Sequence, residues 1–263
     1  MTTPLAYDAL VLAGTRGTED PLAHDTGVSH RALLRINGVA MLERVVAALE
    51  SSTRIERIWV SIDRPEVIST VAGLRDRVES GRLQVLESER SPSTSTLRAL
   101  DSLPDIRRLL VTTADHALLE RQMIDAFLAA ADDEASDVAV ALVDAERIRA
   151  RFPDALRTYI AFRGARYSGA NLFALRTAKA RRAVEFWTRA EDFRKHPWRL
   201  ASTFGPVSLV LFALRLLRLE EAFGRASRVI GAEVRAVDLP FAEAAIDVDR
   251  RADHELVERI LSP

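Results

Sequence analysis

The 263-residue sequence contains no cysteine, which excludes a disulfide scaffold, a thiolate metal site and a cysteine nucleophile. It also lacks an excess of charge of either sign, because 37 basic residues stand against 38 acidic ones and the formal net charge is −1. Binding to a nucleic-acid backbone requires a basic surplus on some face of the protein. We therefore expect no nucleic-acid partner.

Long apolar runs are missing as well. The longest, VSLVLFAL at 207–214, is far shorter than the roughly 20 residues that a bilayer span requires. The N-terminal segment has neither the basic region nor the apolar core of a signal peptide. Hydrophobic residues nevertheless make up 48% of the chain, enough for a buried core. These features predict a globular, cytoplasmic protein.

Short apolar segments alternate with amphipathic segments along the first half of the chain. We expect strands at 8–14, 54–63, 83–88 and 136–145, a fourth strand with its loop at 107–117, and helices at 40–52, 65–78, 91–103 and 120–131. The first of these strands is an apolar run that ends in glycine, as is typical of a buried parallel strand. The alternation predicts an α/β fold in which a mostly parallel sheet carries helices on both faces.

The second half has a different pattern. A further strand is expected at 167–176, followed by a helical insertion at about 177–231 that is rich in arginine, tryptophan and phenylalanine, and then by a strand, a loop and a terminal helix. No internal repeat or low-complexity segment interrupts the chain. The sequence thus predicts one domain over residues 1–263 with a helical insertion in its C-terminal half.

Polar residues follow the expected first strand, at the edge of the sheet where open parallel sheets bind ligands. Gly14 and Gly17 would let backbone N–H groups approach a phosphate, and Arg16 would neutralise its charge. A glycine turn that only leaves a strand is the alternative interpretation. Arg31 follows this loop and could reach the same phosphate or lie in solvent.

Three aspartates indicate a cation site. Asp115 follows the fourth strand, where its carboxylate could hold Mg²⁺ or cap a helix. Asp247 and Asp249 close another expected strand, and side chains two residues apart on a strand share a face. Carboxylates from both places could therefore meet around one metal ion.

With these features in place, the chain resembles the MobA-like nucleotidyltransferases, a family with the Rossmann-like, glycosyltransferase-A-type NTP transferase fold. The family pattern opens Leu-Ala-Gly-Gly-x-Gly-x-Arg, continues through Lys-Ala-Leu-Leu, a glycine, a Met-Leu helix and an aspartate after the fourth strand, and ends with Asp-x-Asp. The counterparts here are Leu12–Gly17, Arg31–Leu34, Gly38 with Met41 and Leu42, Asp115, and Asp247–Asp253. They span the chain in the family's order.

The resemblance implies Mg²⁺-dependent transfer of a nucleoside monophosphate from an NTP, with CTP slightly favoured, to a phosphorylated small molecule or lipid headgroup, with release of pyrophosphate. It implies that Arg16, Arg31 and Asp115 are catalytic, and that Asp115 and Asp249 hold the metal, with Asp247 as the alternative second ligand. The nucleotide-binding residues that it implies are Leu12, Ala13, Gly14, Thr15, Gly17, Ser93 and Ser95.

Several positions depart from the family pattern. Thr15 stands where a second glycine is usual, Glu19 where an arginine is common, and Arg31 where the family has lysine. His116 and Ala117 replace a residue-plus-proline pair. These departures predict a diverged nucleotide or acceptor preference. The alternatives are a non-catalytic nucleotide-binding or scaffold protein, and a nucleotide-sugar glycosyltransferase, which usually carries its Asp-x-Asp in the middle of the chain.

Arginines and aromatic residues gather before and within the insertion. Arg157, Tyr159, Arg163 and Asn171 could form a pocket for an anionic acceptor, because guanidinium pairs well with phosphate; solvated arginines at a strand edge are the alternative. Residues 198–219 join an apolar helix to basic flanks. This segment could contact a membrane surface, pack in the core or form the face of a homodimer.

Overall fold

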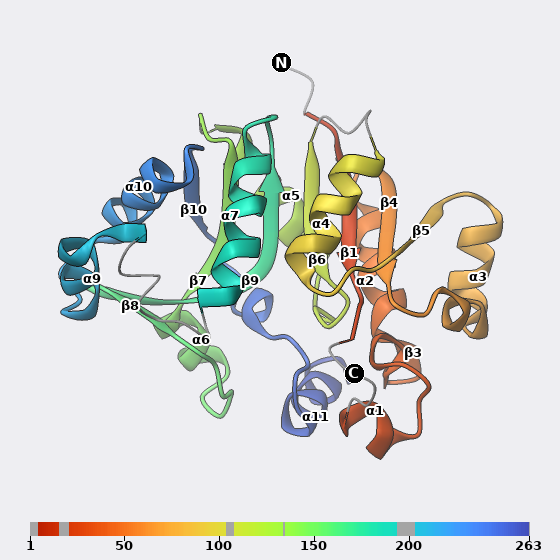
Figure 1. Cartoon of the computed structure of the whole chain (residues 1–263). Coiled ribbons are helices and arrows are strands. Elements are labelled where there is room, and N and C mark those ends of the chain that lie inside the picture. Colours follow the sequence, from red (N-terminus) through yellow and green to blue (C-terminus); the bar gives the residue numbers. More distant parts are fainter. Residues whose placement is uncertain (1–4, 16–20, 104–107, 134, 194–202, 263) are drawn as a thin grey trace.

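The computed structural model describes residues 5–15, 21–103, 108–133, 135–193 and 203–262. Its centre is an eight-stranded sheet with the order β10-β7-β9-β6-β1-β4-β5, in which β8 pairs with β9 (Figure 1). The strands are β1 (Tyr7–Leu12), β4 (Ile55–Ile62), β5 (Leu83–Glu87), β6 (Leu109–Thr113), β7 (Val138–Asp144), β8 (Ile160–Phe162), β9 (Ala165–Leu175) and β10 (Val234–Asp238). A separate two-stranded ribbon joins β2 (Arg35–Ile36) to β3 (Val39–Ala40).

The central sheet is mixed but mostly parallel, as predicted. Strands β4, β1 and β6 run parallel to one another, and β5 extends this set. Strand β9 is antiparallel to both β6 and β7, and it links this set to the parallel pair β7 and β10. All six residues of β1 are buried, as expected for a central strand covered on both faces.

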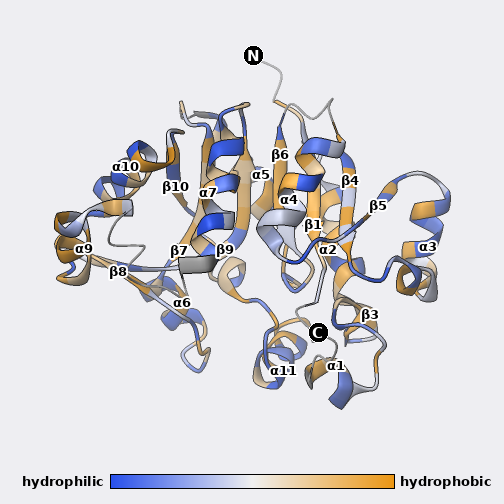
Figure 2. Cartoon of the chain, in the orientation of Figure 1, coloured by the Kyte–Doolittle hydropathy of each residue, from blue (hydrophilic) through white to orange (hydrophobic). Residues whose placement is uncertain are grey.

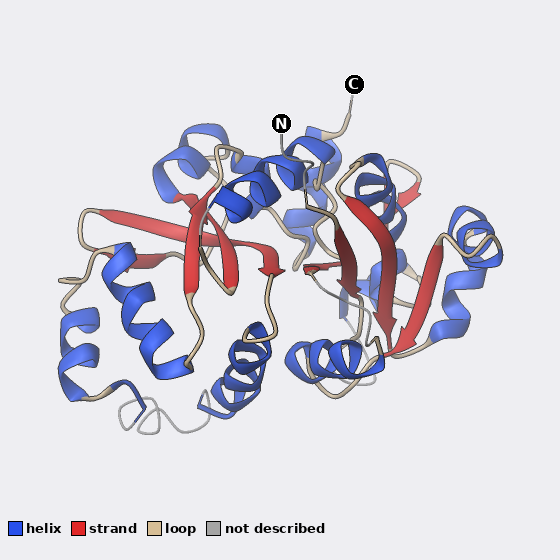
Figure 3. Ribbon diagram, turned by 90° about the horizontal axis from the view of Figure 1, so that it is seen from above, coloured by secondary structure: helices blue, strands red, loops and turns tan. Residues whose placement is uncertain are grey.

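Helices cover both faces of the sheet (Figures 1 and 3). Helices α4 (Pro92–Ser102) and α7 (Ala180–Phe193) lie in front of the sheet in Figure 1, and α2 (Met41–Ser51) and α5 (Arg121–Asp133) lie behind it. Successive residues of β1 point to opposite faces, so Leu10 packs in the front core and Val11 in the larger core behind. The predicted α/β architecture is therefore confirmed.

The remaining helices lie around the sheet. They are α1 (Pro21–Thr26), α3 (Ala72–Glu79), α6 (Ala145–Arg151), α9 (Pro206–Ala213), α10 (Leu219–Ile230) and α11 (Arg251–Ile260), with 3-10 turns η1 (Arg31–Leu33), η2 (Pro65–Thr70) and η3 (Ala242–Ala245). Within the expected insertion, the described residues form α7, α9 and α10 and contain no strand. The extent of a single domain over 1–263 stays a prediction. No helix in the described part of the chain is long and apolar enough to cross a membrane.

Two expected elements differ in the structure. The helix expected at 65–78 is divided into η2 and α3, because Val71 between them has extended backbone angles. The strand expected at Asp247 and Asp249 is an irregular segment between η3 and α11. In this segment the Val248 N–H donates to the carbonyl of Asp115, just after β6, at 3.0 Å.

Candidate functional site

A cavity of about 420 Å³ opens at the carboxyl ends of β1, β4 and β6. The segments around it come from distant parts of the chain: the loop after β1, the turn η1, the loop before α4, the end of β6 and the C-terminal segment. The lining residues are Leu12, Ala13, Gly14, Thr15, Arg31, Ala32, Met41, Ser61, residues 88–92, Ser95, Thr113, Ala114, Asp115 and Asp249. Parallel strands end at one edge of a sheet, which brings these loops together.

The loop after β1 passes close to the loop before α4. A Cβ atom on Gly14 would lie 2.9 Å from the hydroxyl of Ser88, so only glycine fits there without a shift of that side chain. Thr15 follows, and its N–H and its hydroxyl each donate to the carboxylate of Asp63 at 2.9 Å. Arg16 and Gly17, both expected to bind the triphosphate, lie outside the described residues.

Asp63 also binds the residue that precedes Arg31. The His30 side chain is completely buried. Its Nδ1 accepts the N–H of Ala32 at 3.1 Å, so the ring proton of the neutral imidazole is assigned to Nε2, which donates to Asp63 Oδ1 at 3.0 Å. Burial raises the pKa of Asp63, but the hydrogen bonds from His30 and Thr15 outweigh it, and the pKa lies below its usual value.

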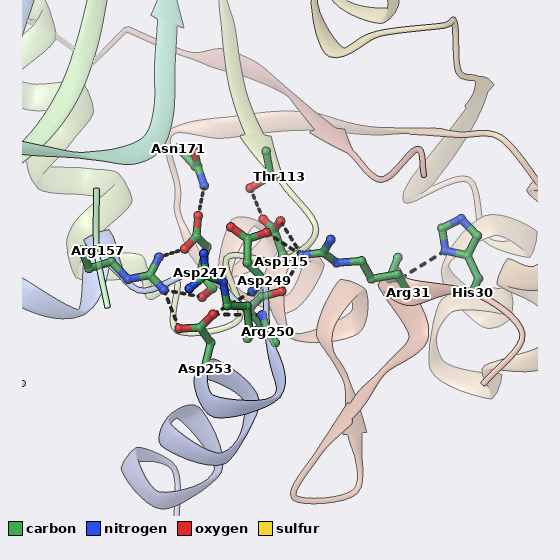
Figure 4. A network of polar contacts seen from close by, with 12 residues as sticks. His30, Arg31, Thr113, Asp115, Arg157, Asn171, Asp247, Asp249, Arg250 and Asp253 are labelled. Carbon is green, nitrogen blue, oxygen red and sulfur yellow. Dashed lines mark hydrogen bonds and ion pairs between the residues drawn. The ribbon is translucent and has the colours of Figure 1, made fainter. Parts of the chain in front are cut away.

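Arg31 lies between two carboxylates (Figure 4). Its Nη2 donates to Asp249 Oδ1 and to the carbonyl of Val248, each at 2.6 Å, and lies 3.6 Å from Asp115 Oδ2. Thr113 donates its hydroxyl to Asp115 Oδ1 at 2.5 Å. Burial raises the pKa of Asp115, against the opposing effects of the Thr113 hydrogen bond and the Arg31 charge. The structure thus brings together Arg31, Asp115 and Asp249.

Asp115 and Asp249 fit the protein part of a magnesium site. Among the described residues no group of three or more candidate metal ligands occurs, so these two carboxylates stand without a third protein ligand. Mg²⁺ in phosphate-transferring sites is usually held by one or two carboxylates together with substrate phosphates and water. Both carboxylates line the cavity, and they supply the oxygen ligands that Mg²⁺ prefers.

Asp247 has other partners than Asp115 and Asp249, and its expected role as the alternative metal ligand stays a prediction. Its carboxylate forms an ion pair with Arg157 and accepts the side-chain N–H of Asn171 at 3.0 Å. Arg157 also donates to Asp253 Oδ1 at 3.0 Å. Figure 4 shows Arg31 and Arg157 approaching the C-terminal segment from opposite sides. Asp247 and Asp249 thus pair with different arginines, Arg157 and Arg31.

The four residues expected to bind an acceptor also have different partners rather than one shared pocket. The side chain of Arg157 is only 7% exposed, and together with Asn171 it binds Asp247. The ring of Tyr159 lies under the Arg149 guanidinium, 4.7 Å from its central carbon. Arg163 lies at the exposed turn between β8 and β9, where its backbone N–H donates to Leu217. These contacts do not bring the four residues together within the described part of the chain, and their role in acceptor binding stays a prediction.

The two serines expected near the nucleotide occupy different positions. Ser95 lines the cavity, and its hydroxyl accepts the N–H of Glu89 at 2.8 Å. Ser93 is buried beside Ser91, at 3.0 Å between the hydroxyls, and it is Ser91, the N-cap of α4, that lines the cavity. Ser61 lines it as well, with a buried hydroxyl that has no hydrogen-bond partner among the described residues.

Ser61, Ser91, Asp63 and His30 were not predicted from the sequence as site residues. The available signal was weak: Ser61 and Asp63 stand at the end of an apolar strand, and His30 precedes Arg31.

His116, at a position where the family pattern differs, is completely buried, and neither ring nitrogen has a partner in the described part of the chain. Burial lowers the pKa of His116 to about 4, so the ring is neutral at pH 7.

The fold is that of the NTP transferases. The chain belongs to the family described as the MobA-like NTP transferase domain, which matches residues 9–196. Members of this family generally use divalent metal ions. None of the curated proteins matches the chain.

Several solved structures have the same fold. A hypothetical transferase from Thermus thermophilus is 28% identical, with a TM-score of 0.78, and the match covers 95% of this chain and 100% of that one. A CMP:2-keto-3-deoxy-manno-octonic acid synthetase complexed with CTP is 14% identical, with a TM-score of 0.60 and coverage of 97% and 98%. A 4-diphosphocytidyl-2C-methyl-D-erythritol synthase from Anaerococcus prevotii is 11% identical, with a TM-score of 0.62 and coverage of 98% and 99%. The last two show the fold alone.

Proposed function

We propose that this protein transfers a nucleoside monophosphate from an NTP to a phosphorylated acceptor, with Mg²⁺ bound and pyrophosphate released. The observation that carries the proposal is the meeting of Arg31, Asp115 and Asp249 at a cavity whose opposite wall is the loop after β1. Cations and carboxylates beside a glycine loop suit a triphosphate and the metal that accompanies it. CTP is the favoured NTP, because two structures of this fold are named for CMP or cytidyl products.

Each part of the cavity has a role in this proposal. Asp115 and Asp249 hold Mg²⁺, which when bound neutralises phosphate charge and polarises the bond that breaks. Arg16, Arg31, and the backbone from Gly14 to Gly17 hold the triphosphate. Leu12, Ala13, Ser91 and Ser95 contact the nucleoside. The acceptor phosphate oxygen attacks the α-phosphorus in line, the bond to the β-phosphate oxygen breaks, and no covalent enzyme intermediate forms.

The acceptor is an anion in this proposal. Arg90 lines the cavity and is available to bind it, whereas Arg157 and Asn171 act on the site by holding the C-terminal segment through Asp247. A lipid headgroup is the second acceptor class that we consider. It is favoured by the exposed apolar side chains of α9, which lie beside the turn that carries Arg163.

The test is thermal unfolding with each NTP, with and without Mg²⁺, followed by pyrophosphate release with pooled phosphomonoesters. We expect one NTP to raise the melting temperature in a Mg²⁺-dependent way. Asp115→Asn and Asp249→Asn should each lower the rate of pyrophosphate release at least about a hundredfold, as expected on losing a metal ligand. The matched control is Asp238→Asn. Asp238 also ends a strand, but it lies outside the cavity and pairs with Arg147, with 2.8 Å between Oδ1 and Nη1.

Three results would contradict parts of the proposal. If no NTP stabilises the protein, nucleotide binding is wrong. If both variants keep the wild-type Mg²⁺ dependence, the metal assignment is wrong. Binding without pyrophosphate release would favour a nucleotide-binding scaffold, and sugar transfer from a nucleotide-sugar would favour a glycosyltransferase.

A further inference from the structure

Thr15, in the glycine loop, differs from the usual glycine by a side chain whose hydroxyl forms a hydrogen bond. Its φ angle is outside the left-handed region, so the backbone there does not require glycine. The hydroxyl and the N–H of Thr15 both donate to the two oxygens of Asp63, at 2.9 Å each. Thr15 is therefore attached to the end of β4 by two hydrogen bonds to one carboxylate.

The same carboxylate holds the turn that carries Arg31. His30 is the N-cap of η1, and η1 begins at Arg31. The His30 ring reaches Asp63 with Nε2, at 3.0 Å, and caps the turn with Nδ1. Next to Asp63, Arg64 donates to the carbonyl of Ser29. The glycine loop and the Arg31 turn, 15 residues apart in sequence, are thus joined through Asp63.

We propose that Asp63 is a positioning residue for nucleotide transfer, because its carboxylate fixes the Thr15 loop relative to the turn that carries Arg31. This inference rests on the proposed function, in which both elements bind phosphate. The role of Asp63 is to keep the two phosphate-binding elements in one relative position before the nucleotide arrives, which reduces the ordering cost of binding.

The network uses both side-chain atoms at the end of Asp63. The Thr15 N–H and the His30 Nε2–H both reach Oδ1, and the Thr15 hydroxyl reaches Oδ2. Asparagine could keep these three contacts, because its oxygen can accept both N–H groups and its amide N–H₂ can donate to the Thr15 hydroxyl, which accepts as well as donates. Asp63→Ala is therefore the disruptive change, and Asp63→Asn is its conservative control.

The first measurement needs no substrate. Thr15→Val removes the hydroxyl and keeps the shape of the side chain, and Thr15→Ser is its matched control. Amide hydrogen exchange of the nucleotide-free protein should be about threefold or more faster in residues 29–34 of Thr15→Val, because a hydrogen bond to a charged group is lost. It should be unchanged in Thr15→Ser. An unchanged rate in Thr15→Val would overturn the coupling, whether or not the protein is active.

The second measurement is kinetic. We expect Asp63→Ala to raise the KM for the NTP about tenfold, consistent with the loss of hydrogen bonds to a charged group, and to leave the KM for the acceptor within about twofold, while Asp63→Asn stays closer to wild type. His30→Asn should also raise the NTP KM, because asparagine can still cap η1 but does not reach Asp63. Circular dichroism confirms that each variant is folded.

The results distinguish a failure of the positioning role of Asp63 from a failure of the proposed nucleotide transfer. Unchanged NTP KM values in folded Asp63→Ala and His30→Asn, with an active wild type, would overturn the positioning role alone. A wild type that binds no NTP and releases no pyrophosphate would overturn the proposed function and, with it, the role in transfer, even if hydrogen exchange shows that Thr15 and the Arg31 turn are coupled.

Discussion

Single side chains at the edge of the sheet are held by opposite charges placed around them. At the site, Arg31 has carboxylates on both sides, at 2.6 and 3.6 Å. At the other end of the strands, Asp132 has a similar position, because Tyr7, Arg54 and Arg176 all approach it. In each case one residue joins segments that are distant in sequence. Asp132 lies away from the cavity, so its contribution to the free energy of unfolding can be measured without a change in the site.

The substitution Tyr7→Phe tests the contribution of the contact with Asp132 to stability. The Tyr7 hydroxyl donates to Asp132 Oδ1 at 2.8 Å, and burial, followed by the hydrogen bond to Asp132, raises the pKa of Tyr7 to about 12. A raised pKa means that this stabilisation is complete below about pH 10, the pKa of an unfolded tyrosine, and is lost as the pH rises toward 12. We expect Tyr7→Phe to lower the free energy of unfolding at pH 7 by about 1 to 2 kcal/mol.

The measurement is urea unfolding of both proteins at pH 7 and at pH 11, where the difference between them should be smaller. Tyr159→Phe is the matched control, because Tyr159 contacts Arg149 through its ring, which phenylalanine keeps. A difference that grows between pH 7 and pH 11 would contradict this account of Tyr7.

The sequence predicts the meeting of Asp115 with Asp249, because both follow expected strands of a parallel sheet. It does not predict the attachment of Thr15 to Asp63, since the partners are 48 residues apart and neither residue type specifies the other. Asp247 shows a further limit: its spacing from Asp249 does not predict that it pairs with Arg157 rather than with a residue of the cavity.

Among the secondary-structure elements, α11 controls the geometry of the site most directly. Asp253 in its first turn accepts the N–H of Arg250 at 2.9 Å and a hydrogen bond from Arg157 at 3.0 Å. Asp253 is 6% exposed, so these contacts are buried. The start of α11 thus fixes the segment that presents Asp249 to Arg31.

We expect Asp253→Ala to lower the free energy of unfolding by about 3 kcal/mol, because it leaves the buried Arg157 with one carboxylate fewer and removes a helix cap. Chemical denaturation measures this loss. Glu255→Ala, which removes an exposed carboxylate paired with Arg251 in the same helix, should change stability by less than about 0.5 kcal/mol. Equal effects of the two substitutions would show that the buried network does not stabilise α11.

Most expected elements are confirmed to within a few residues, because apolar periodicity reports directly on burial. The strands β1, β4, β5, β6 and β7 and the helices α2, α4 and α5 lie where the pattern places them. The short elements β8 and α6 were not expected, since three to seven residues carry too little periodicity. The break between η2 and α3 depends on the backbone at Val71 and has no clear sequence signal.

At the scale of the whole molecule, the end that carries α9 exposes apolar side chains to solvent. Helix α9 lies at the left end in Figure 1, with α3 at the opposite end, and Figure 2 shows hydrophobic colour along α9. None of the eight residues of α9 is buried. Val207 and Val210 are 66% and 56% exposed. Exposed arginines lie beside them: Arg163, Arg215 and Arg218.

An exposed apolar surface next to cations is typical of proteins that bind anionic membrane surfaces. The expected contact was placed at 198–219, of which residues 198–202 lie outside the described part of the chain. If α9 makes this contact, changing Val207 and Val210 together to lysine should abolish most of the cosedimentation with vesicles that contain anionic phospholipid. The free energy of unfolding should change by less than about 1 kcal/mol, because both side chains are already in solvent.

The control is Val78→Lys, which adds a cation at α3, at the other end of the molecule, where the side chain is 37% exposed. It should leave vesicle binding unchanged or make it slightly stronger. Added positive charge alone strengthens attraction to anionic lipid. A loss of binding in the double variant must therefore come from the apolar contact. If wild type does not sediment with vesicles but forms dimers that the double variant loses, α9 is a homodimer face, and the membrane prediction is wrong.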